Sequence, residues 1–423
     1  EMLRSLVGSE MCIRDRIIPS KLRGSVSIPA SKSIVHRALI SAALADGVSV
    51  ISNVTFSQDI YATIDALKAI GAEIEVSGNT VTVKGLSENT PETADINCAE
   101  SGSTLRFLIP VTSALGISAV YSGRGRLPER PITPYIRELS EKGIHFDYNN
   151  TMPFTVSGKL RSGIFKLEGN VSSQFVTGLL FALPLLENDS EIVLTSRLES
   201  KPYADMTISC LDKFGVKISE TGNGYYIKGG QKYKPVSLTA EGDYSQAAFF
   251  YVANILGSDI KINNLSDNSS QGDKKIVEII NGLCYNNNEK PDGFRLDASD
   301  VPDLVPILGV LGAYCEGKSV IYNAARLKIK ESDRLAATAE AVNALGGKII
   351  PSEDGLIIHH SELTGGTADS AGDHRIAMSA AIAATICSQP VIIKNAESVE
   401  KSYPDFFRDY INLGGTVNVI TLE

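Results

Sequence analysis

Six apolar runs of helical length recur along the chain, and each opens on a cluster of polar residues. In each run a Gly, Asp or Asn interrupts the helical pattern, and a short strand rich in β-branched residues follows. The runs start 57 to 72 residues apart, at His36, Arg106, Gln174, Gln246, Asp303 and His374. This regular spacing predicts six repeats of one structural unit.

A second series of amphipathic helices alternates with the first. Each of these helices is expected to end at a glycine cap and to be followed by two strands around a polar turn, as in ALKAIGAEIEVSGNTVTVKG at 66–85. The capping glycines are Gly71, Gly143, Gly215, Gly282, Gly346 and Gly414. Each unit is therefore predicted to run helix, strand, loop, helix, strand, strand.

The length of the repeat decides between two architectures. Solenoid repeats usually contain about 20 to 45 residues, so units this long are better accommodated as three in each of two globular lobes. The helices that open the units are apolar on nearly all sides, which predicts that they lie inside a lobe with the sheets outside. We expect an α/β fold with two lobes.

Composition excludes several classes of protein. The 423 residues suffice for two or three domains, and 43% are hydrophobic without an apolar run long enough to span a membrane. A net charge of -9 argues against binding nucleic acid or an anionic membrane through bulk charge. Six scattered cysteines without a CxxC pair predict neither a disulfide framework nor a zinc site, and they favour a reducing cytoplasm.

The N-terminal segment 1–16 (EMLRSLVGSEMCIRDR) lacks the apolar core and cleavage site of a signal peptide. We interpret it as a non-native leader and expect the organised chain to begin near Ile17.

The polar clusters that open the buried helices point to an anion-binding face. Helix N-termini carry unsatisfied N–H groups and positive dipole ends, although Ser, Thr and Asp are also ordinary capping residues. Four of the clusters contain Lys, Arg or Gln, among them Ser31-Lys32-Ser33 and Asp373-His374-Arg375. More cations lie in the later loops GRGRLPERP, RLESKPY, RLKIKESDR and EKSYPDFF. Cations gathered between two lobes would repel one another, which suggests a cleft that closes on a phosphorylated or carboxylated ligand.

Other classes of site lack their motifs. The chain contains no GxxxxGK[ST], no HExxH and no GxSxG, and Gly123-Arg124-Gly125 is followed by Pro128 rather than by a helix. A P-loop enzyme, a metal site, a dinucleotide site and an α/β-hydrolase are therefore disfavoured.

Ten ordered motifs resemble the 5-enolpyruvylshikimate-3-phosphate synthase family, from about Ile17 to the C-terminus. They are PASKSIVHRALISAALADG, ESGSTLRFLIP, GRGRLPERPI, VSSQFVTGLL, SKPYADMT, EGDYSQAAFF, VPDLVPIL, LKIKESDRL, GDHRIAMS and KSYPDFF. The resemblance implies the two-lobed enolpyruvyl transferase fold, an inside-out α/β barrel of six βαβαββ repeats with a double-stranded hinge. It implies one lobe at 31–240 and the other at 17–30 plus 241–423.

The resemblance also implies a reaction. The carboxyvinyl group of phosphoenolpyruvate is transferred to the 5-hydroxyl of shikimate 3-phosphate, in the shikimate pathway to chorismate and aromatic amino acids, through a tetrahedral intermediate and with release of phosphate. It implies no metal and no organic cofactor. We expect a cytoplasmic monomer whose partners are these two small molecules, without nucleic acid or membrane.

Site residues are implied where the motifs match. The phosphoshikimate site would comprise Lys32, Ser33, Arg37, Ser172, Ser173, Gln174, Ser200, Tyr203, Asp303 and Lys330. The phosphoenolpyruvate site would comprise Lys32, Gly102, Arg130, Gln174, Arg334, His374, Arg375 and Lys401. Serine hydroxyls and helix N–H groups suit a phosphate monoester, and Arg forks suit a carboxylate and a second phosphate.

Four residues are expected to carry out the chemistry. Asp303 would deprotonate the attacking hydroxyl, Glu331 would handle the proton at the methylene carbon, and Lys32 and Lys401 would polarise phosphate and share in proton transfer. Simpler roles stay open, namely a helix cap for Asp303 and an ion pair within KESDR for Glu331.

The chain departs from the family pattern at three places. Glu100-Ser101-Gly102-Ser103 stands where many relatives have Asn-Ala-Gly-Thr, and it keeps the glycine that leaves room beside phosphoenolpyruvate, which predicts sensitivity to glyphosate. Val35 replaces a frequent Ser. Arg326 stands where some members have an Asn that contacts the substrate phosphate.

Two alternatives stay open. The sister transferase acting on UDP-N-acetylglucosamine typically has Asn after its N-terminal Lys and a Cys in the mobile loop, whereas here Ser33 follows Lys32 and GRGRLPERP has no Cys. A non-catalytic binder of phosphorylated metabolites would need the cations but not Asp303 and Glu331 together.

Overall fold

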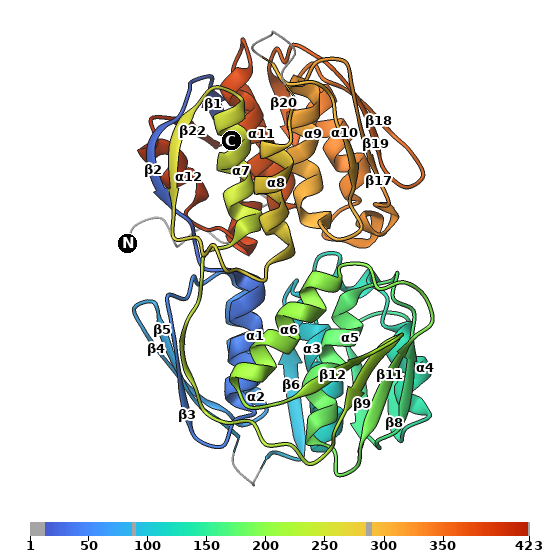
Figure 1. Cartoon of the computed structure of the whole chain (residues 1–423). Helices are drawn as coiled ribbons and strands as arrows, with labels where there is room; N and C mark the ends of the chain where they lie inside the picture. Colours follow the sequence, from blue (N-terminus) through green and yellow to red (C-terminus); the bar gives the residue numbers. More distant parts are fainter. Residues whose placement is uncertain (1–12, 87–89, 285–289, 422–423) are drawn as a thin grey trace.

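The computed structural model describes residues 13–86, 90–284 and 290–421. They form two lobes, one above the other in Figure 1, and each lobe has its own hydrophobic core. The core of the first lobe extends from Ala30 to Ala240. The core of the second lobe combines Ile17 to Ile28 with Tyr244 to Leu413.

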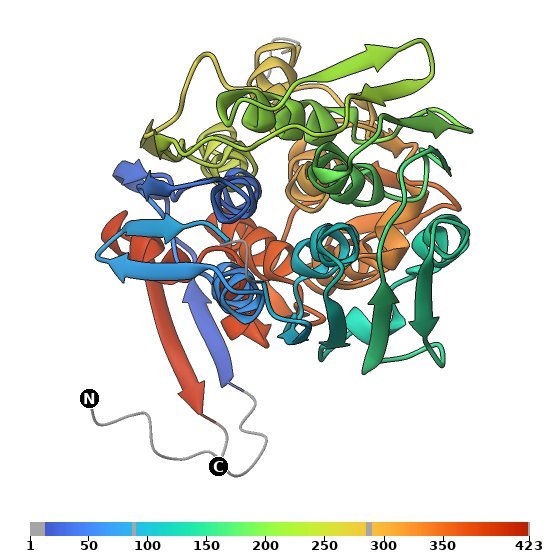
Figure 2. The same cartoon turned by 90° about the horizontal axis from the view of Figure 1, so that it is seen from below.

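Six buried helices open the six units, as the apolar runs predicted. They are α1 (Lys32–Ala43), α3 (Gly102–Leu115), α5 (Ser173–Ala182), α7 (Tyr244–Ile255), α9 (Val305–Tyr314) and α11 (His374–Ala383). The helices of the second series are α2 (Gln58–Ala69), α4 (Thr133–Ser140), α6 (Lys201–Lys213), α8 (Lys275–Asn281), α10 (Arg334–Ala344) and α12 (Phe406–Asn412). Viewed along their axes, the helices lie in the interior with the strands around them (Figure 2).

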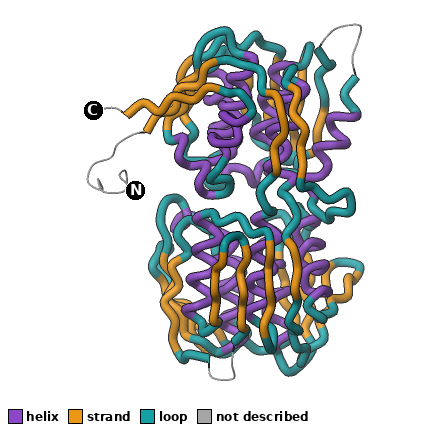
Figure 3. The backbone as a smooth tube through the Cα atoms, turned by 90° about the vertical axis from the view of Figure 1, so that its left-hand side faces the viewer, coloured by secondary structure: helices purple, strands orange, loops and turns teal. Residues whose placement is uncertain are grey.

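The first lobe contains three four-stranded sheets with one strand order. They are β14 (Ser237–Thr239), β3 (Val48–Ser52), β5 (Thr80–Lys84) and β4 (Glu73–Ser77); β6 (Thr93–Asn97), β7 (Ser118–Ser122), β9 (Phe154–Gly158) and β8 (Ile144–Asp147); and β10 (Ile164–Leu167), β11 (Ser190–Leu194), β13 (Gly224–Ile227) and β12 (Ile218–Thr221). In each sheet the first two strands are parallel and the last two form an antiparallel hairpin. Figure 3 shows these strands on the outside of the helices, as expected from the all-round apolar character of the inner helices.

Two sheets of the second lobe repeat this order and the third is smaller. They are β16 (Arg295–Asp297), β17 (Lys318–Tyr322), β19 (Leu356–His359) and β18 (Lys348–Pro351); β20 (Gly366–Asp369), β21 (Val391–Lys394), β1 (Ile13–Ile18) and β22 (Thr416–Thr421); and the pair β15 (Asp259–Asn263) with β2 (Arg23–Ser27). The N-terminal strands thus complete sheets of the second lobe.

The fourth unit corrects the expectation of six identical repeats. Among the described residues no hairpin follows α8, and Gly282 has φ of -87°, whereas the other five capping glycines have positive φ. The segment 285–289 lies outside the described residues. The shortest spacing between units, 57 residues from Gln246 to Asp303, falls in this unit.

The organised chain also begins earlier than Ile17. Strand β1 starts at Ile13 and pairs with β21 and β22, and Asp15 within it is buried. The charged residues of this strand conceal it in the sequence, because its pairing with strands from the far C-terminus provides the burial. The rest of the proposed leader, 1–12, lies outside the described residues.

The chain passes between the lobes twice, and the two passages are hydrogen-bonded to each other. Ala30 and Gly242 form an antiparallel bridge, the Ser31 N–H donates to the Glu241 carbonyl at 2.8 Å, and the Asp243 N–H donates to the Pro29 carbonyl at 2.9 Å. We propose lobe boundaries at this paired segment, which gives 31–240 for one lobe and 17–30 plus 241–423 for the other, and β1 extends the second lobe at its start by residues 13–16.

Candidate active site

One pocket between the lobes is lined by the N-terminal ends of helices from both lobes. It lies where α1, α3, α5, α6, α10 and α11 begin, so their N–H groups and side chains face a common space. Its lining comprises Lys32, Ser33, Arg37, Asp59, Gly102, Ser103, Arg106, Phe107, Arg130, Val171, Ser172, Ser173, Gln174, Ser200, Tyr203, Asp243, Asp303, Arg326, Ile329, Lys330, Glu331, Arg334, His374 and Arg375.

All the site residues expected from the motifs line this pocket except Lys401. Lys401 lies at its edge, where its Nζ is 2.6 Å from a Glu100 carboxylate oxygen and 2.8 Å from the Gly372 carbonyl oxygen. The motifs did not assign Asp59, whose Oδ2 is 2.7 Å from Lys32 Nζ. An acidic residue in the first turn of α2 is an ordinary helix feature, so the sequence contains no signal for this contact.

The helix starts contain residues that cap the helices as well as residues that face the pocket. Ser101 and Ser172 accept hydrogen bonds from backbone N–H groups of α3 and α5, and Asp243 and Asp373 do the same for α7 and α11. Asp303 does not cap α9. It lies in a short 3-10 helix, Pro302–Leu304, and its carboxylate faces the pocket cations instead.

Arg37, in the first lobe, is held entirely by neutral groups. Its guanidinium donates to Thr207 Oγ1 at 2.8 Å, to the Ser33 carbonyl at 2.8 Å and to the Tyr203 carbonyl at 2.9 Å. Burial lowers the pKa of Arg37 to about 10, and no carboxylate among the described residues pairs with it to offset this effect. An anionic ligand would therefore stabilise the positive charge of Arg37.

Arg106 is held in the same way. Its guanidinium donates to Gln174 Oε1 at 2.7 Å and to the Pro131 carbonyl at 3.2 Å. Burial, followed by the neighbouring charge of Arg130, lowers the pKa of Arg106 to about 9. Gln174 in turn donates to Ser103 Oγ at 3.0 Å, so the starts of α3 and α5 are fixed relative to each other.

Asp303 is the centre of charge on the second lobe. Its carboxylate accepts hydrogen bonds from Arg334 at 2.7 Å and Arg375 at 3.0 Å, and Lys330 Nζ is 3.9 Å away. Burial alone would raise the pKa of Asp303, but Arg375, Lys330 and Arg334 together hold it well below its ordinary value. Asp303 is therefore ionised at neutral pH and can accept a proton.

Glu331 has a similar environment. Its carboxylate lies 2.7 Å from Arg334 Nη2, which is the ion pair expected within KESDR, and 3.1 Å from Arg130 Nη2 of the other lobe. Burial would raise the pKa of Glu331, but Arg334 and then Arg130 hold it well below its ordinary value. His374 is buried, and burial, with nearby cations, holds its pKa well below the ordinary value despite the charge of Asp373. The imidazole is therefore neutral.

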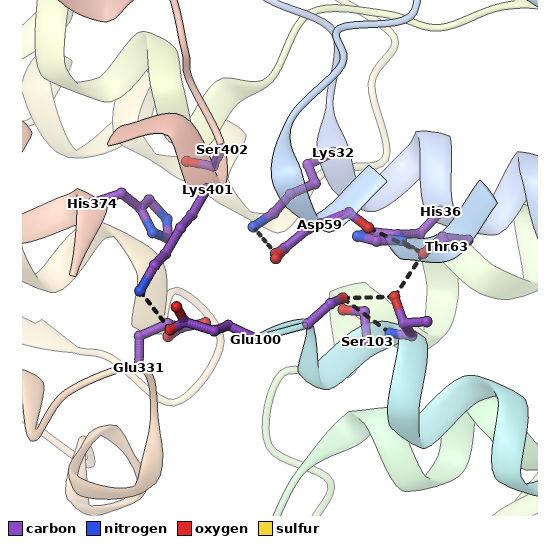
Figure 4. Close-up of polar contacts among 12 residues, drawn as sticks. Lys32, His36, Asp59, Thr63, Glu100, Ser103, Glu331, His374, Lys401 and Ser402 are labelled. Carbon is purple, nitrogen blue, oxygen red and sulfur yellow. Dashed lines mark hydrogen bonds and ion pairs between the residues drawn. The ribbon is translucent and has the colours of Figure 1, made fainter. Parts of the chain in front are cut away.

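The expected repulsion between the lobes is not what the structure shows. Besides Arg130 with Glu331, three ion pairs among the described residues join the lobes: Lys401 with Glu100, Arg326 with Glu199 at 3.1 Å, and Arg197 with Asp300 at 3.9 Å. The carboxylates in these pairs compensate cations that would otherwise repel one another across the lobes. Figure 4 shows Lys401 reaching Glu100, with His374 beside it.

Behind Lys32, a buried chain of hydroxyls supports the helix starts (Figure 4). His36 Nδ1 lies 2.7 Å from Thr63 Oγ1, which lies 2.7 Å from Thr104 Oγ1, and Thr104 donates to Ser101 Oγ at 2.8 Å. Burial lowers the pKa of His36 well below its ordinary value, so the ring is neutral. The network ties α1, α2 and α3 together without adding charge.

In the described part of the chain, no three His, Cys, Asp or Glu side chains come together as metal ligands. No helix described is both long enough and apolar enough to cross a membrane.

A pocket between two α/β lobes that is lined by cations and contains two ionised carboxylates is typical of an enzyme that acts on anionic substrates. A sequence model of the family described as EPSP synthase (3-phosphoshikimate 1-carboxyvinyltransferase) matches residues 17–410. The chain belongs to this family.

Individual relatives agree with this assignment. The 3-phosphoshikimate 1-carboxyvinyltransferase of Clostridium novyi is 47% identical, with 95% of this chain and 98% of the relative covered. That of Clostridium kluyveri is 46% identical, with 95% and 97% covered.

Solved structures share the fold. EPSP synthase from Acinetobacter baumannii superposes with a TM-score of 0.81 at 25% identity, covering 97% of this chain and all of that one. The enolpyruvyl transferase NikO from Streptomyces tendae has a TM-score of 0.78 at 17% identity, covering 98% and 100%, and supports the fold alone.

Proposed function

We propose how the side chains of the pocket divide the work of the family's reaction. The chain transfers the carboxyvinyl group of phosphoenolpyruvate to the 5-hydroxyl of shikimate 3-phosphate and releases phosphate. The observation that carries the division is a pair of partly buried carboxylates, Asp303 and Glu331, which the surrounding cations hold ionised.

The first lobe binds the phosphate of the acceptor. Arg37 and the start of α5, with Ser172 and Ser173, offer donors that no carboxylate occupies. A phosphate monoester supplies the negative charge that these groups lack. Ser200, Tyr203 and Lys330 extend this site toward Asp303, which places the acceptor hydroxyl beside the carboxylate.

Phosphoenolpyruvate lies between the lobes. Arg130 and Arg334 bind its carboxylate and phosphate groups, together with Lys32, Gln174, Arg375 and Lys401, and Gly102 leaves space beside Arg130. Arg130 and Arg334 are also the two cations closest to Glu331. When an anionic substrate shares these cations, burial dominates the environment of Glu331 and its carboxylate gains a proton.

Once Glu331 is protonated and Asp303 is ionised, each carboxyl group can perform a different proton transfer. Asp303 takes the proton of the 5-hydroxyl as its oxygen attacks C2 of phosphoenolpyruvate, and protonated Glu331 delivers a proton to the methylene carbon. The resulting tetrahedral ketal then loses a methyl proton back to Glu331 as the bond to the phosphate oxygen breaks. Lys32 and Lys401 stabilise the departing phosphate, which leaves with the proton taken up by Asp303.

We further propose that a single chain acts in the cytoplasm. Both substrate sites are formed by one chain, which supports a monomer. All five described cysteines are free and four of them are buried, which supports a reducing compartment.

The decisive experiment measures phosphate release from phosphoenolpyruvate with shikimate 3-phosphate, and in parallel with UDP-N-acetylglucosamine. We expect release only with shikimate 3-phosphate. Release only with the nucleotide sugar would overturn the acceptor site, and release with neither would favour a binding protein.

A further inference from the structure

Asp273 is a buried carboxyl outside the pocket lining that contacts the proposed site through one residue. It lies in the 3-10 helix Gly272–Lys274 and is 5% exposed. Its Oδ2 is 2.8 Å from the Tyr203 hydroxyl, and its Oδ1 has no hydrogen-bond partner among the described residues. Within the described part of the chain it forms no ion pair, unlike Asp303.

The Tyr203 hydroxyl lies between two carboxylates. Its oxygen is 2.8 Å from Asp273 Oδ2 and 3.0 Å from Asp303 Oδ2, so both are within hydrogen-bond distance. A phenol has one hydrogen and can donate it to only one of them. The second contact becomes a hydrogen bond only if a carboxyl group supplies its own hydrogen to the phenol oxygen. The geometry therefore accommodates one proton shared by Asp273 and Asp303.

The surrounding charges decide which carboxyl group carries that proton. Asp303 is held ionised by Arg375, Lys330 and Arg334. Burial and the negative charge of Asp303 raise the pKa of Asp273 to about 7. The negative charge of Asp243, at the start of α7, also raises it, whereas Arg375 of α11 and the hydrogen bond from Tyr203 lower it. The proton therefore resides on Asp273 below about pH 7.

We propose that Asp273 is a positioning residue that acts through Tyr203 and sets the basicity of Asp303 toward the acceptor hydroxyl. This inference rests on the proposed role of Asp303 as the base. With Asp273 protonated, its O–H donates to Tyr203 and Tyr203 donates to Asp303, which weakens Asp303 as a base. With Asp273 ionised, Tyr203 turns its hydrogen to Asp273, and a second negative charge beside Asp303 makes that carboxylate more basic.

The sign of the pH effect follows. Asp273 loses its proton as pH rises through about 7, so kcat rises over the same interval. Asp273→Asn keeps a neutral donor toward Tyr203 at every pH and should remove this rise. The substrate phosphates titrate in the same range in every variant, so the comparison between variants isolates Asp273.

The experiment compares kcat and KM of the full chain from pH 5.5 to 9 for three proteins: unmodified, Asp273→Asn and Asp15→Asn. Asp15 is the matched control, because burial likewise raises its pKa, to about 6, but it lies in β1 and does not line the pocket. We expect Asp273→Asn to match the unmodified protein below pH 6, to have about threefold lower kcat at pH 8.5, and to keep its KM for shikimate 3-phosphate. Asp15→Asn should follow the unmodified profile. An Asp273→Asn profile that keeps the rise would overturn the proposal.

A second variant and a spectroscopic measurement guard against an Asp273→Asn protein that does not fold. Tyr203→Phe removes the hydroxyl through which Asp273 acts, and with it a hydrogen bond that stabilises ionised Asp273. The kcat rise should therefore become smaller and its midpoint should move to higher pH, and a rise unchanged in size and midpoint would count against the relay. Infrared spectra of the unmodified protein should lose the C=O band of a protonated carboxyl as pH rises through about 7, and absence of that band at pH 6 would also overturn it. Full turnover by Asp303→Asn would instead refute the proposed base and leave the infrared result standing.

Discussion

Arg37 and Arg106 on the first lobe are held by hydroxyl, amide and carbonyl oxygens, whereas Arg334 and Arg375 on the second lobe are held by carboxylates. The two pairs of arginines therefore differ in the direction in which their pKa values are shifted. Burial lowers the pKa of Arg37 and of Arg106, but Asp373, Glu331 and Asp303 more than offset the effect of burial on Arg334 and raise its pKa.

The difference separates two tasks of one pocket. On the first lobe the buried positive charge is uncompensated, so it contributes affinity for a substrate anion. On the second lobe the cations keep buried carboxylates ionised, so it contributes groups that accept and return protons. Lys32 and Arg130 do not follow this division, because Asp59 and Glu331 compensate their charges.

The largest expected effect comes from the carboxylates of the second lobe. Glu331→Gln keeps the shape of the side chain but cannot carry the proton to the methylene carbon, so kcat should fall about a thousandfold. Calorimetric binding of shikimate 3-phosphate should stay within about threefold. Turnover close to that of the unmodified protein would show that the second lobe does not perform the proton transfer.

On the first lobe, Arg37→Met should impair binding rather than chemistry. A charge-assisted hydrogen bond contributes about 1.5 to 3 kcal/mol, so KM for shikimate 3-phosphate should rise about 10- to 100-fold while kcat changes little. Arg408→Met is the matched control, since Arg408 is exposed and forms an ion pair with Asp405 away from the pocket lining. A fall confined to kcat would contradict the division of tasks.

Substitution of Gly102 tests the position of Arg130, which reaches from the first lobe to Glu331 of the second. A Cβ placed there would lie 2.4 Å from Arg130 Nη1, so Gly102→Ala must displace the arginine that also contacts Glu331. We expect KM for phosphoenolpyruvate and the inhibitory concentration of glyphosate to rise about tenfold or more. Gly222→Ala is the control, because a Cβ there meets nothing within 4 Å. Full turnover of the unmodified protein in millimolar glyphosate at low phosphoenolpyruvate would contradict the expected sensitivity.

The lowered pKa of Lys330 predicts that the affinity for shikimate 3-phosphate depends on pH. Burial lowers its pKa to about 8, against the opposing charges of Asp303 and Glu331. Lys330 is therefore positive below about pH 8 and neutral above it, so affinity for shikimate 3-phosphate should fall as pH rises, by about fivefold between pH 7.5 and 9. Calorimetry in two buffers of different ionisation enthalpy should detect proton uptake on binding at pH 8, and Lys330→Arg should abolish both effects.

The smallest expected effect has the opposite sign to that of Arg37→Met. Glu100 competes with a substrate phosphate for Lys401, so Glu100→Gln should lower KM for phosphoenolpyruvate about twofold, as suits a partly exposed ion pair. Glu400→Gln is the matched control, since Glu400 makes an exposed contact with Gln58 between the same lobes. An increase in KM would mean that Glu100 holds the lobes together more than it competes.

The sequence predicted most of the fold because its signals are local. Apolar periodicity marked the buried helices, and five of the six glycines predicted as caps have the left-handed conformation. The incomplete fourth unit was not predicted, although its spacing is the shortest. The polar clusters identified the helix starts that line the pocket. Motif resemblance assigned most of the lining, because helix starts carry the motifs.

Contacts between distant segments could not be predicted in this way. Tyr203 meets Asp303 100 residues away, and Lys401 meets Glu100 301 residues away. Strand β1 needs partners from the opposite end of the chain.

The sequence by itself thus determined the repeats, the two lobes and the family. Tertiary structure alone decided which cations face carboxylates and which do not, because that depends on how separate helix starts are packed together. The pairing matters most where the groups are buried, since charges out of contact with water interact strongly with their immediate neighbours. The chemical state of Asp303, Glu331 and Asp273 is therefore a property of the assembled pocket.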